Sequence, residues 1–363
     1  MAKRKKILMT GGHITPAIAV ADALKKTNTQ IDIVFAGRDT SIEGSNSQSE
    51  EARLVNQRGF RFVSIQAGRI TRAFTLLTAV GIFRIPFGFI AAFGICLSER
   101  PDVIVSFGGY VALPVVIAGW MLAIPSITHE QTLSPGLANR IIGLFAKKIC
   151  VSFPQTVKDF PSDKTVLTGL PLRESMFHPP KNSPFPLGNK PLIIVTGGST
   201  GAVTLNRLVF PIVENLTTYY SIIHQTGRLD LQNAPDVPNY FATAYLDEPA
   251  YAWAIGHADL VVGRSGANTV GEVAVLGKVA LFVPLPWSGG NEQYENARYL
   301  ETVGTSQVLN QKNLTPGKLL GAIEGIFRDK QTYDKKAVEI SREFPRDGAV
   351  RVADQVMAIL SHA

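Results

Sequence analysis

The chain has 363 residues, of which 45% are hydrophobic and 18% charged, and this composition excludes a disordered protein. The length predicts two domains, each large enough to bury a core. The net charge of +7 indicates an anionic partner, and nucleic acid is disfavoured because no basic run is interleaved with aromatic residues. Cys96 and Cys150 both lie in apolar runs, which predicts buried thiols rather than a disulfide.

Short apolar runs alternate with helical patterns along the whole chain. The basic residues Lys3–Lys6 are followed at once by an apolar triplet and by Thr10-Gly11-Gly12, which is typical of a first strand and its turn rather than of a signal peptide. Most strand candidates precede a glycine-rich turn and a helical segment, and this order predicts βαβ units with parallel sheets. The candidates are Lys6–Met9, Ile31–Ala36, Val103–Phe107, Ser126–Thr128, Lys148–Ser152, Leu192–Thr196, Tyr220–Gln225, Leu260–Val262 and Val279–Val283.

Two strand–glycine–helix openings lie about half a chain apart. The first runs through Thr10–Gly12 into a helix over Pro16–Lys25, and the second runs through Thr196–Gly201 into a helix over Ala202–Phe210. This duplication predicts two Rossmann-like domains. We expect a first domain over residues 1–168 with a last helix over 345–363. A linker rich in proline over 169–190 and a second domain over 191–344 complete the expected division.

Residues 73–97 are almost wholly apolar. Arg84 and Pro86 are expected to break this segment into two short helical pieces, each below the roughly 20 residues of a membrane span. A buried crossover helix and a helix that dips into the membrane interface both remain open. Arg69 and Arg72 favour the interfacial interpretation because they add positive charge beside it.

Three groups of polar residues follow strands of the first half. Thr10-Gly11-Gly12-His13 allows close backbone approach to a ligand, and a histidine there is a candidate general base. Phe107-Gly108-Gly109-Tyr110 and His129-Glu130-Gln131 end two further strands and should line the same edge of the sheet. A tight structural turn and a packing histidine are the alternatives.

The second half offers similar candidates. Gly197-Gly198-Ser199-Thr200-Gly201 could hold a phosphate, but it lacks the G-x-G-x-x-G spacing of nicotinamide-binding proteins. Arg264–Thr269 opens a helix whose second turn carries Glu272, and a carboxylate there could accept bonds from a ribose diol. Gln293 begins a later helix and could bind sugar hydroxyls. A structural turn, a surface glutamate and an ordinary N-terminal helix residue are the alternatives.

Taken in order, these motifs resemble the MurG family, which adds N-acetylglucosamine to the lipid-linked muramyl-pentapeptide precursor of peptidoglycan. The resemblance covers nearly the whole chain and rests on the combination of motifs rather than on any single one. The motifs are Thr10–His13 with Pro16, Phe107–Val111, His129–Gln131, Pro135–Arg140, Gly169…Pro171…Arg173, Gly197–Ala202, His224–Gly227, Tyr251–Ala254, Arg264–Glu272 and Gln293–Ala297.

The resemblance implies an α/β protein of the GT-B glycosyltransferase fold, with two Rossmann-like domains facing each other across a cleft. It implies an inverting transfer to the 4-hydroxyl of the acceptor, without cofactor or metal, and His13 as the catalytic residue. The first domain would bind the acceptor and the membrane, and the second would bind the UDP-sugar. The implied donor-binding residues are Thr10, Gly11, Gly12, Arg173, Ser199, Leu246, Ala267, Asn268, Thr269, Val270, Glu272 and Gln293. The implied acceptor-binding residues are Tyr110, His129, Glu130, Gln131 and Thr132.

The implied partners are UDP-N-acetylglucosamine, a polyprenyl-pyrophosphate-linked muramyl-peptide and an anionic membrane surface bound through residues 73–93, with no nucleic acid. The implied location is peripheral, on the cytoplasmic face of the inner membrane, in cell-wall synthesis. Leu8-Met9, Thr132, Asn268 and Gly271 depart from the family pattern, and Thr132 replaces an asparagine of the acceptor site. A related glycolipid synthase, a non-catalytic sugar-nucleotide-binding protein and a nicotinamide-dependent oxidoreductase are the alternatives.

Overall fold

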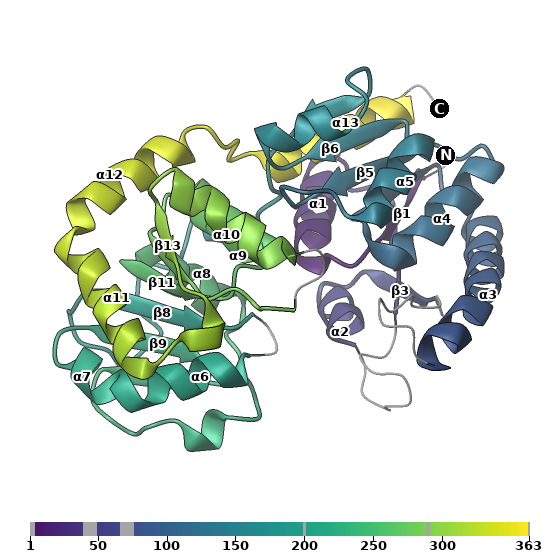
Figure 1. The fold of residues 1–363 in the computed structure, drawn as a ribbon. Coiled ribbons are helices and arrows are strands. Elements are labelled where there is room, and N and C mark those ends of the chain that lie inside the picture. Colours follow the sequence, from purple (N-terminus) through teal and green to yellow (C-terminus); the bar gives the residue numbers. More distant parts are fainter. Residues whose placement is uncertain (1–3, 39–48, 66–75, 199–200, 288–290, 362–363) are drawn as a thin grey trace. The chain divides into compact units, whose positions relative to one another are not determined.

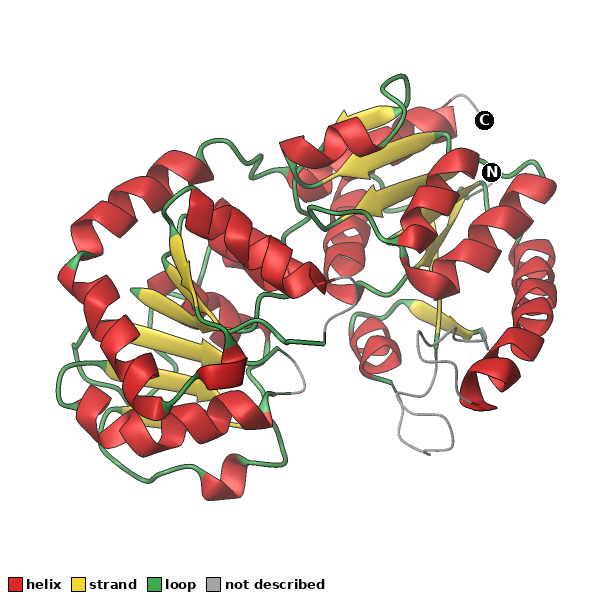
Figure 2. Cartoon of the chain, in the orientation of Figure 1, coloured by secondary structure: helices red, strands yellow, loops and turns green. Residues whose placement is uncertain are grey.

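The computed structural model describes residues 4–38, 49–65, 76–198, 201–287 and 291–361; for residue 50 and residues 76–85 it describes the backbone alone. The chain forms two compact units, Met1–Arg173 together with Arg346–Ala363, and Glu174–Pro345. In each unit the strands gather in one sheet with helices packed around it (Figures 1 and 2). The two parallel sheets confirm the predicted α/β class and the two Rossmann-like domains.

The first unit contains a parallel sheet of seven strands in the order β3-β2-β1-β4-β5-β6-β7. The strand order reverses beside β1, so the carboxyl ends of β1 and β4 form the point at which such sheets bind ligands. The strands are β1 (Lys6–Thr10), β2 (Asp32–Gly37), β3 (Arg61–Ser64), β4 (Val103–Ser106), β5 (Ser126–Glu130), β6 (Lys148–Val151) and β7 (Thr165–Leu167).

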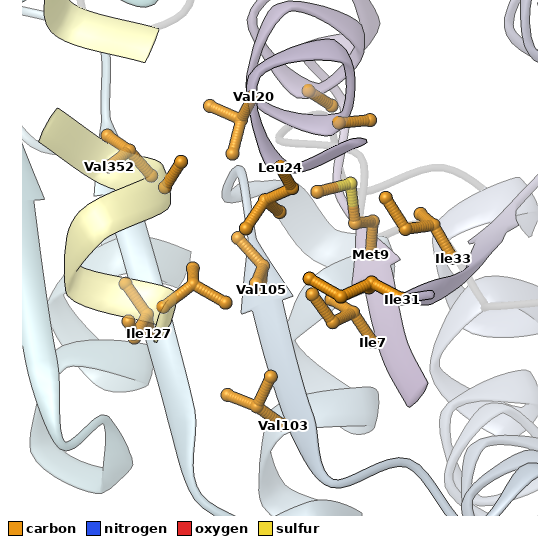
Figure 3. Close-up of a cluster of buried hydrophobic side chains, with 14 of the residues drawn as sticks. Ile7, Met9, Val20, Leu24, Ile31, Ile33, Val103, Val105, Ile127 and Val352 are labelled. Carbon is orange, nitrogen blue, oxygen red and sulfur yellow. The ribbon is translucent and has the colours of Figure 1, made fainter. Parts of the chain in front are cut away.

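Helices cover both faces of this sheet. Alternate side chains of β1 point to opposite faces, so Ile7 and Met9 join one core cluster and Leu8 joins another. The cluster with Ile7 and Met9 also contains Val105 and residues of α1 and α13 (Figure 3). The helical segments of the unit are α1 (Ile14–Thr27), α2 (Glu50–Gln57), α3 (Leu76–Glu99), α4 (Gly109–Met121), α5 (Leu137–Phe145), η1 (Pro154–Asp159) and α13 (Gly348–Ser361).

The last helix, α13, belongs to the first unit although the second unit precedes it in the chain. Val352, Val356, Ile359 and Leu360 recur at helical spacing and are buried against the first sheet, where α13 packs beside α1 (Figure 1). Burial of each such side chain contributes about 1.5–3 kcal/mol, which is sufficient to dock the helix.

The second unit repeats the arrangement with six parallel strands in the order β10-β9-β8-β11-β12-β13. Its strands are β8 (Leu192–Thr196), β9 (Ser221–Gln225), β10 (Tyr240–Thr243), β11 (Leu260–Gly263), β12 (Ala280–Phe282) and β13 (Ser306–Val308). Its helices are η2 (Glu174–Met176), α6 (Val203–Val209), η3 (Phe210–Ile212), α7 (Val213–Thr217), η4 (Leu231–Asn233), α8 (Glu248–His257), α9 (Ala267–Leu276), α10 (Glu292–Thr302), η6 (Gln311–Asn313), α11 (Pro316–Arg328) and α12 (Lys330–Ser341).

The prediction that Arg84 and Pro86 break the apolar segment was wrong. One helix, α3, runs from Leu76 to Glu99 with Pro86 inside it. A proline removes one backbone hydrogen bond, but its fixed φ is compatible with a helix, and tertiary packing supplies most of the stability of a helix. Across the described residues, no helix has both the length and the apolar character that a membrane span requires. Cys96 and Cys150 are buried and free, as predicted.

Candidate active site

The loops after β1 and β4 touch each other at the point where the strand order of the first sheet reverses. Gly11 has a φ of +140°, and a side chain there would lie 2.8 Å from the backbone of Phe107. The Gly12 N–H donates to the Gly108 carbonyl over 3.1 Å. Only glycine allows this approach, and the two loops together form one backbone surface at the ligand-binding edge of the sheet.

His13 is the residue that precedes α1. Its side chain makes no capping hydrogen bond, and the first turn of the helix contains no acidic residue. The ring is partly buried, and its removal from water lowers the pKa of His13 below its usual value. His13 is therefore neutral near pH 7 and able to accept a proton.

Buried polar atoms without a partner lie at the carboxyl ends of β1 and β5. Thr10 Oγ1, His129 Nδ1 and both side-chain atoms of the Gln131 amide are buried, and none has a hydrogen-bond partner among the described residues. His129 Nε2 lies 3.1 Å from the Gly169 carbonyl and so donates to it, which leaves Nδ1 as an acceptor. Burial lowers the pKa of His129 to about 4; the hydrogen bond to Gly169 acts in the opposite direction, and the electrostatic effect of a proton on His13 lowers the pKa further. An unpaired buried polar group costs about 1–3 kcal/mol, so this edge is suited to a polar ligand.

Glu130 is held by a network of donors at the end of β5. Asn139 Nδ2 donates to Oε2 over 2.8 Å, and the backbone N–H of Thr132 donates to Oε1 over 2.9 Å. Thr132 Oγ1 lies 2.7 Å from the same Oε1. Burial raises the pKa of the Glu130 carboxyl, while these hydrogen bonds act in the opposite direction. Thr132, which replaces the asparagine of the family pattern, therefore still places a polar side chain against Glu130.

Tyr110 is the second residue of α4 and follows Gly108 and Gly109. Its ring lies 5.2 Å from the guanidinium of Arg38. Gly108 has a φ of +73°, and a side chain there would lie 2.6 Å from Asn139 Nδ2. The predicted acceptor residues therefore lie at one edge of the first sheet together with His13, and Asn139 links them.

In the second unit, the glycine loop follows β8 at the equivalent place. Gly198 and Gly201 have φ values of +84° and +78°, and a side chain at Gly201 would lie 2.4 Å from the Thr226 carbonyl. Gln225 Nε2 donates to the Gly198 carbonyl over 2.7 Å. The predicted phosphate ligand Ser199 lies outside the described residues.

The N-terminus of α9 follows β11 and has no side-chain cap at Gly266 and no acidic residue in its first turn. Free N–H groups at such an end favour an anion. Asn268 and Thr269 lie in this first turn, between Ala267 and Val270. The Asn268 Oδ1 atom is buried and has no partner within the described ranges.

Glu272 lies on the second turn of α9 and is 4% exposed. The hydroxyl of Tyr251, on α8, donates to Glu272 Oε2 over 2.6 Å. A short bond to a charged acceptor fixes the carboxylate one turn beyond the uncapped helix end. The two features together can contact a diol and a diphosphate.

Three further predicted donor residues, Gln293, Leu246 and Arg173, lie in this unit or next to it in the chain. Gln293 is the second residue of α10, its Oε1 accepts from the Leu285 N–H over 3.0 Å, and its carbonyl accepts from the Ser265 hydroxyl. The Leu246 N–H donates to Gln225 Oε1. Arg173 is the last residue of the first unit before the chain enters the second. Over the described part of the chain, no three His, Cys, Asp or Glu side chains cluster as metal ligands would.

Two family models match the chain in sequence. Residues 10–151 match the glycosyltransferase family 28 N-terminal domain, and residues 192–352 match the C-terminal domain of the same family. A relative from Clostridium botulinum (strain Langeland) is 33% identical over 341 residues, covering 91% of this chain and 93% of the relative. Its name is UDP-N-acetylglucosamine–N-acetylmuramyl-(pentapeptide) pyrophosphoryl-undecaprenol N-acetylglucosamine transferase. A relative of the same name from Borrelia hermsii is 30% identical and covers 98% of both chains.

The crystal structure of Acinetobacter baumannii MurG is similar to this chain with a TM-score of 0.72 and 26% sequence identity, covering 98% and 99% of the two chains. The chain belongs to the MurG family of glycosyltransferases. Membership confirms the resemblance that the motifs carried, and the similar structures confirm the GT-B fold.

Three polar side chains in this MurG-family protein were not predicted as site residues, although each lies inside a motif that carried the resemblance. Asn139 holds Glu130, Tyr251 holds Glu272, and Gln225 joins Gly198 to Leu246. Their motifs were visible in the sequence, but their partners lie between 9 and 27 residues away along the chain. Only the folded sheets bring each pair together.

Proposed function

We propose that this protein transfers N-acetylglucosamine from UDP-N-acetylglucosamine to the 4-hydroxyl of a lipid-linked N-acetylmuramyl-pentapeptide, the step from lipid I to lipid II in peptidoglycan synthesis. Membership of the MurG family and the names of its relatives support both substrates. The observation that carries the donor assignment is the Glu272 carboxylate, fixed by Tyr251 one turn beyond the uncapped end of α9.

The donor binds at the carboxyl edge of the second sheet. Glu272 accepts hydrogen bonds from the two ribose hydroxyls, and the N–H groups of residues 267–270 face the diphosphate. Leu246, whose N–H donates to Gln225 Oε1, contacts the uracil base through its backbone. Gln293, whose Oε1 accepts from the Leu285 N–H, contacts the sugar hydroxyls. Arg173, Ser199 and Thr10–Gly12 complete the proposed donor set.

The reaction is a single displacement with inversion. The acceptor's 4-hydroxyl oxygen attacks the anomeric carbon, its proton passes to neutral His13, and the bond from that carbon to the diphosphate oxygen breaks. The negative charge that develops on the leaving UDP is stabilised by the helix N-terminal N–H groups. Tyr110, His129, Glu130, Gln131 and Thr132 hold the acceptor, and the unpaired atoms of His129 and Gln131 support this role.

The outer face of α3 supports a peripheral location at an anionic membrane surface. From Pro86 onward the buried residues of α3 include Ala92, Ile95 and Cys96, while Phe87, Ile90 and Leu97 are exposed on the opposite side. A helix of a soluble protein normally presents polar residues to water. The side chains of residues 76–85 lie outside the described part, so residues 86–93 carry the argument for the proposed segment 73–93. A fully buried crossover helix is inconsistent with this exposure.

Two neighbouring helices, α4 and α5, also expose apolar side chains. α3 packs against α4 and α4 against α5. Trp120 and Met121 of α4 and Leu137 and Leu144 of α5 are exposed, and Leu144 is 70% exposed. Arg140 lies between the two leucines on the outer face of α5 and is itself exposed. Apolar side chains beside a cation suit a surface of anionic lipid headgroups, and we place the protein on the cytoplasmic side of the membrane.

The test is incubation with radiolabelled UDP-N-acetylglucosamine and a short-chain lipid-linked muramyl-pentapeptide. We expect label in the lipid product, joined by an inverted β linkage, with release of UDP. Parallel reactions use diacylglycerol as acceptor and UDP-glucose as donor, and transfer with these alone would instead identify a glycolipid synthase. UDP binding without transfer to either lipid would identify a non-catalytic sugar-nucleotide-binding protein.

A further inference from the structure

Thr132 Oγ1 lies between two oxygen atoms, although its hydroxyl has only one proton to donate. It is 2.7 Å from Glu130 Oε1 and 2.7 Å from the Ser134 carbonyl oxygen. Each distance is that of an undivided O–H···O hydrogen bond, so each contact needs a proton of its own. The Ser134 carbonyl carries no proton. The second proton therefore belongs to the Glu130 carboxyl, which donates to Thr132 while Thr132 donates to Ser134.

Thr156, in η1, shows the geometry of a hydroxyl that divides one proton. Its Oγ1 lies 3.1 Å from the Thr132 carbonyl and 3.1 Å from the Leu133 carbonyl. These lengths are those of a three-centre bond, in which two acceptors share one donor. The two contacts of Thr132 Oγ1 are both shorter, and one shared proton does not account for them.

Glu130 is buried without a counter-ion in the described part of the chain. It is 2% exposed, and no ion pair of the described residues includes it. The titratable or charged side chains on β5 and on the elements packed against it are His129, Tyr110, Arg140, Lys148, Cys150, Arg351 and Asp354. Burial and hydrogen bonds, rather than these charges, set the pKa of Glu130.

Burial raises the pKa of the Glu130 carboxyl and outweighs the groups that favour its ionised form. Those groups are the backbone N–H of Thr132 and of Gly136, the Asn139 amide and the Thr132 hydroxyl. The three N–H donors also bond a neutral carboxyl, so they are compatible with a proton on Oε1. A carboxylate buried without a cation is costly, and the surroundings therefore agree with the proton count.

An asparagine at position 132, as in the family pattern, would change this count. Its amide nitrogen carries two N–H bonds, and it can donate to Glu130 Oε1 and to the Ser134 carbonyl at the same time. No proton from the glutamate is then needed. The replacement of asparagine by Thr132 thus makes the loop between β5 and α5 depend on a proton held by Glu130.

We propose that Thr132 keeps Glu130 as a neutral carboxylic acid at neutral pH, and that this proton positions the loop over residues 131–136 for acceptor binding. Loss of the proton leaves Thr132 with one hydrogen bond in place of two. Gln131 begins this loop, and its buried amide has no partner among the described residues, which suits it to a ligand. The proposal rests on the proposed function, because it deepens the acceptor site. Glu130 is a positioning residue, since it acts through Thr132.

The first test is infrared spectroscopy of the full chain at pH 7, where exposed carboxyl groups are ionised. The carbonyl stretch of a protonated carboxyl is separate from the bands of carboxylates. We expect such a band in the unsubstituted protein and its loss in both Glu130→Gln and Thr132→Asn. Thr156→Val is the matched control, because it removes a buried threonine hydroxyl that contacts the same loop but not Glu130. It should keep the band.

The second test is the acceptor KM, measured with a short-chain lipid-linked muramyl-pentapeptide across the pH at which the band of the unsubstituted protein disappears. The acceptor KM should rise about fivefold, the effect of one hydrogen bond. The KM for UDP-N-acetylglucosamine should not change, because no proposed donor contact lies in this loop. In Thr132→Asn the acceptor KM should not depend on pH over this range, and Thr156→Val should behave as the unsubstituted protein does.

A spectrum from which Glu130→Gln removes no band would overturn the neutral acid. A band that persists in Thr132→Asn would show that burial alone holds the proton, and would overturn the role of Thr132. An acceptor KM that ignores the ionisation would overturn the positioning role. Absence of transfer beside an intact band would overturn the proposed function and the acceptor role, while the neutral acid would stand. Either variant assigns the band, so one that does not fold leaves the other as the test.

Discussion

The hydroxyl of Tyr251 lies 2.6 Å from Oε2 of Glu272, and this bond joins α8 to α9 at the carboxyl edge of the second sheet. A glutamate alone on a helix is a common surface residue. Glu272 is instead buried, and the Tyr251 hydroxyl holds its carboxylate in place. This contact supports the proposal that Glu272 binds the donor and is not an ordinary solvated surface charge.

Replacement of Tyr251 by phenylalanine should weaken UDP binding. The loss of one hydrogen bond to a charged acceptor corresponds to about 1–2 kcal/mol, or roughly a tenfold rise in Kd. The measurement is titration with UDP and with 2′,3′-dideoxy-UDP, which lacks the diol. The penalty should disappear with the dideoxy nucleotide, and a penalty of the same size for both would contradict the ribose assignment. Tyr219→Phe, at an exposed tyrosine of the same unit, is the control.

Replacement of His13 by alanine should reduce the transfer rate about 10²- to 10⁴-fold, the range for loss of a general base. UDP affinity should stay unchanged, because the His13 side chain is not among the proposed donor contacts. Burial lowers the pKa of His13, so it loses its basic form only below its usual value near 6.5, and the unsubstituted protein should retain activity at pH 6.5. His178→Ala, at an exposed histidine, is the control. Near-normal transfer by the His13 variant would show that another group takes the proton.

Replacement of Leu137 and Leu144 by serine should weaken binding to vesicles that contain anionic lipid. Both leucines are more than two-thirds exposed, and removal of their apolar surface should reduce the partition coefficient at least tenfold. Co-sedimentation with vesicles measures the change, and UDP affinity serves as the check on folding. Leu229→Ser removes an equally exposed leucine from the second unit and should have no effect. Equal losses in both variants would argue against a specific membrane face.

The first unit should lose stability as the pH falls. The pKa of His129 is about 4 in the fold against 6.5 in the unfolded chain, so the unfolded state binds the proton first. The contribution of His129 to the free energy of unfolding is therefore fully present above pH 6.5. It falls by about 3 kcal/mol as the pH decreases from 6.5 to 4. Thermal unfolding between pH 4 and 7 measures it. His129→Gln keeps a donor for Gly169 and should make the stability of this unit depend less on pH. An unchanged pH dependence would exclude His129 as its source.

The second unit supplies an internal comparison for this experiment. His224 is buried between the Tyr240 hydroxyl and Asn206 Oδ1, and burial lowers its pKa to about 3. The same sign applies, so the second unit should also lose stability in acid. The pH dependence of the second unit's stability should be unaffected by His129→Gln.

The positions of the central strands and of the glycine loops along the chain were predictable from the sequence. Strands β1, β4, β8 and β11 are buried on both faces, and a strand of that kind is a continuous apolar run that stands out from its surroundings. The glycines at the strand ends, such as Gly11 and Gly198, follow from a local requirement for a positive φ. The order of the motifs along the chain then identified the family, because many of these motifs lie in the loops that follow the strands.

The tertiary structure decided what depends on neighbours distant in the chain. Strands β3, β7, β10 and β13 were not predicted, and all four are the edges of their sheets, where one side lacks a paired strand and side chains are only partly buried. The helix α3 continues through Pro86 because packing on one face offsets the lost hydrogen bond. The partners of Glu130, Glu272 and Gln225 follow from strand register and helix docking, which no local pattern encodes. The sequence thus determined the candidate site residues, and the fold determined which side chains hold them in place.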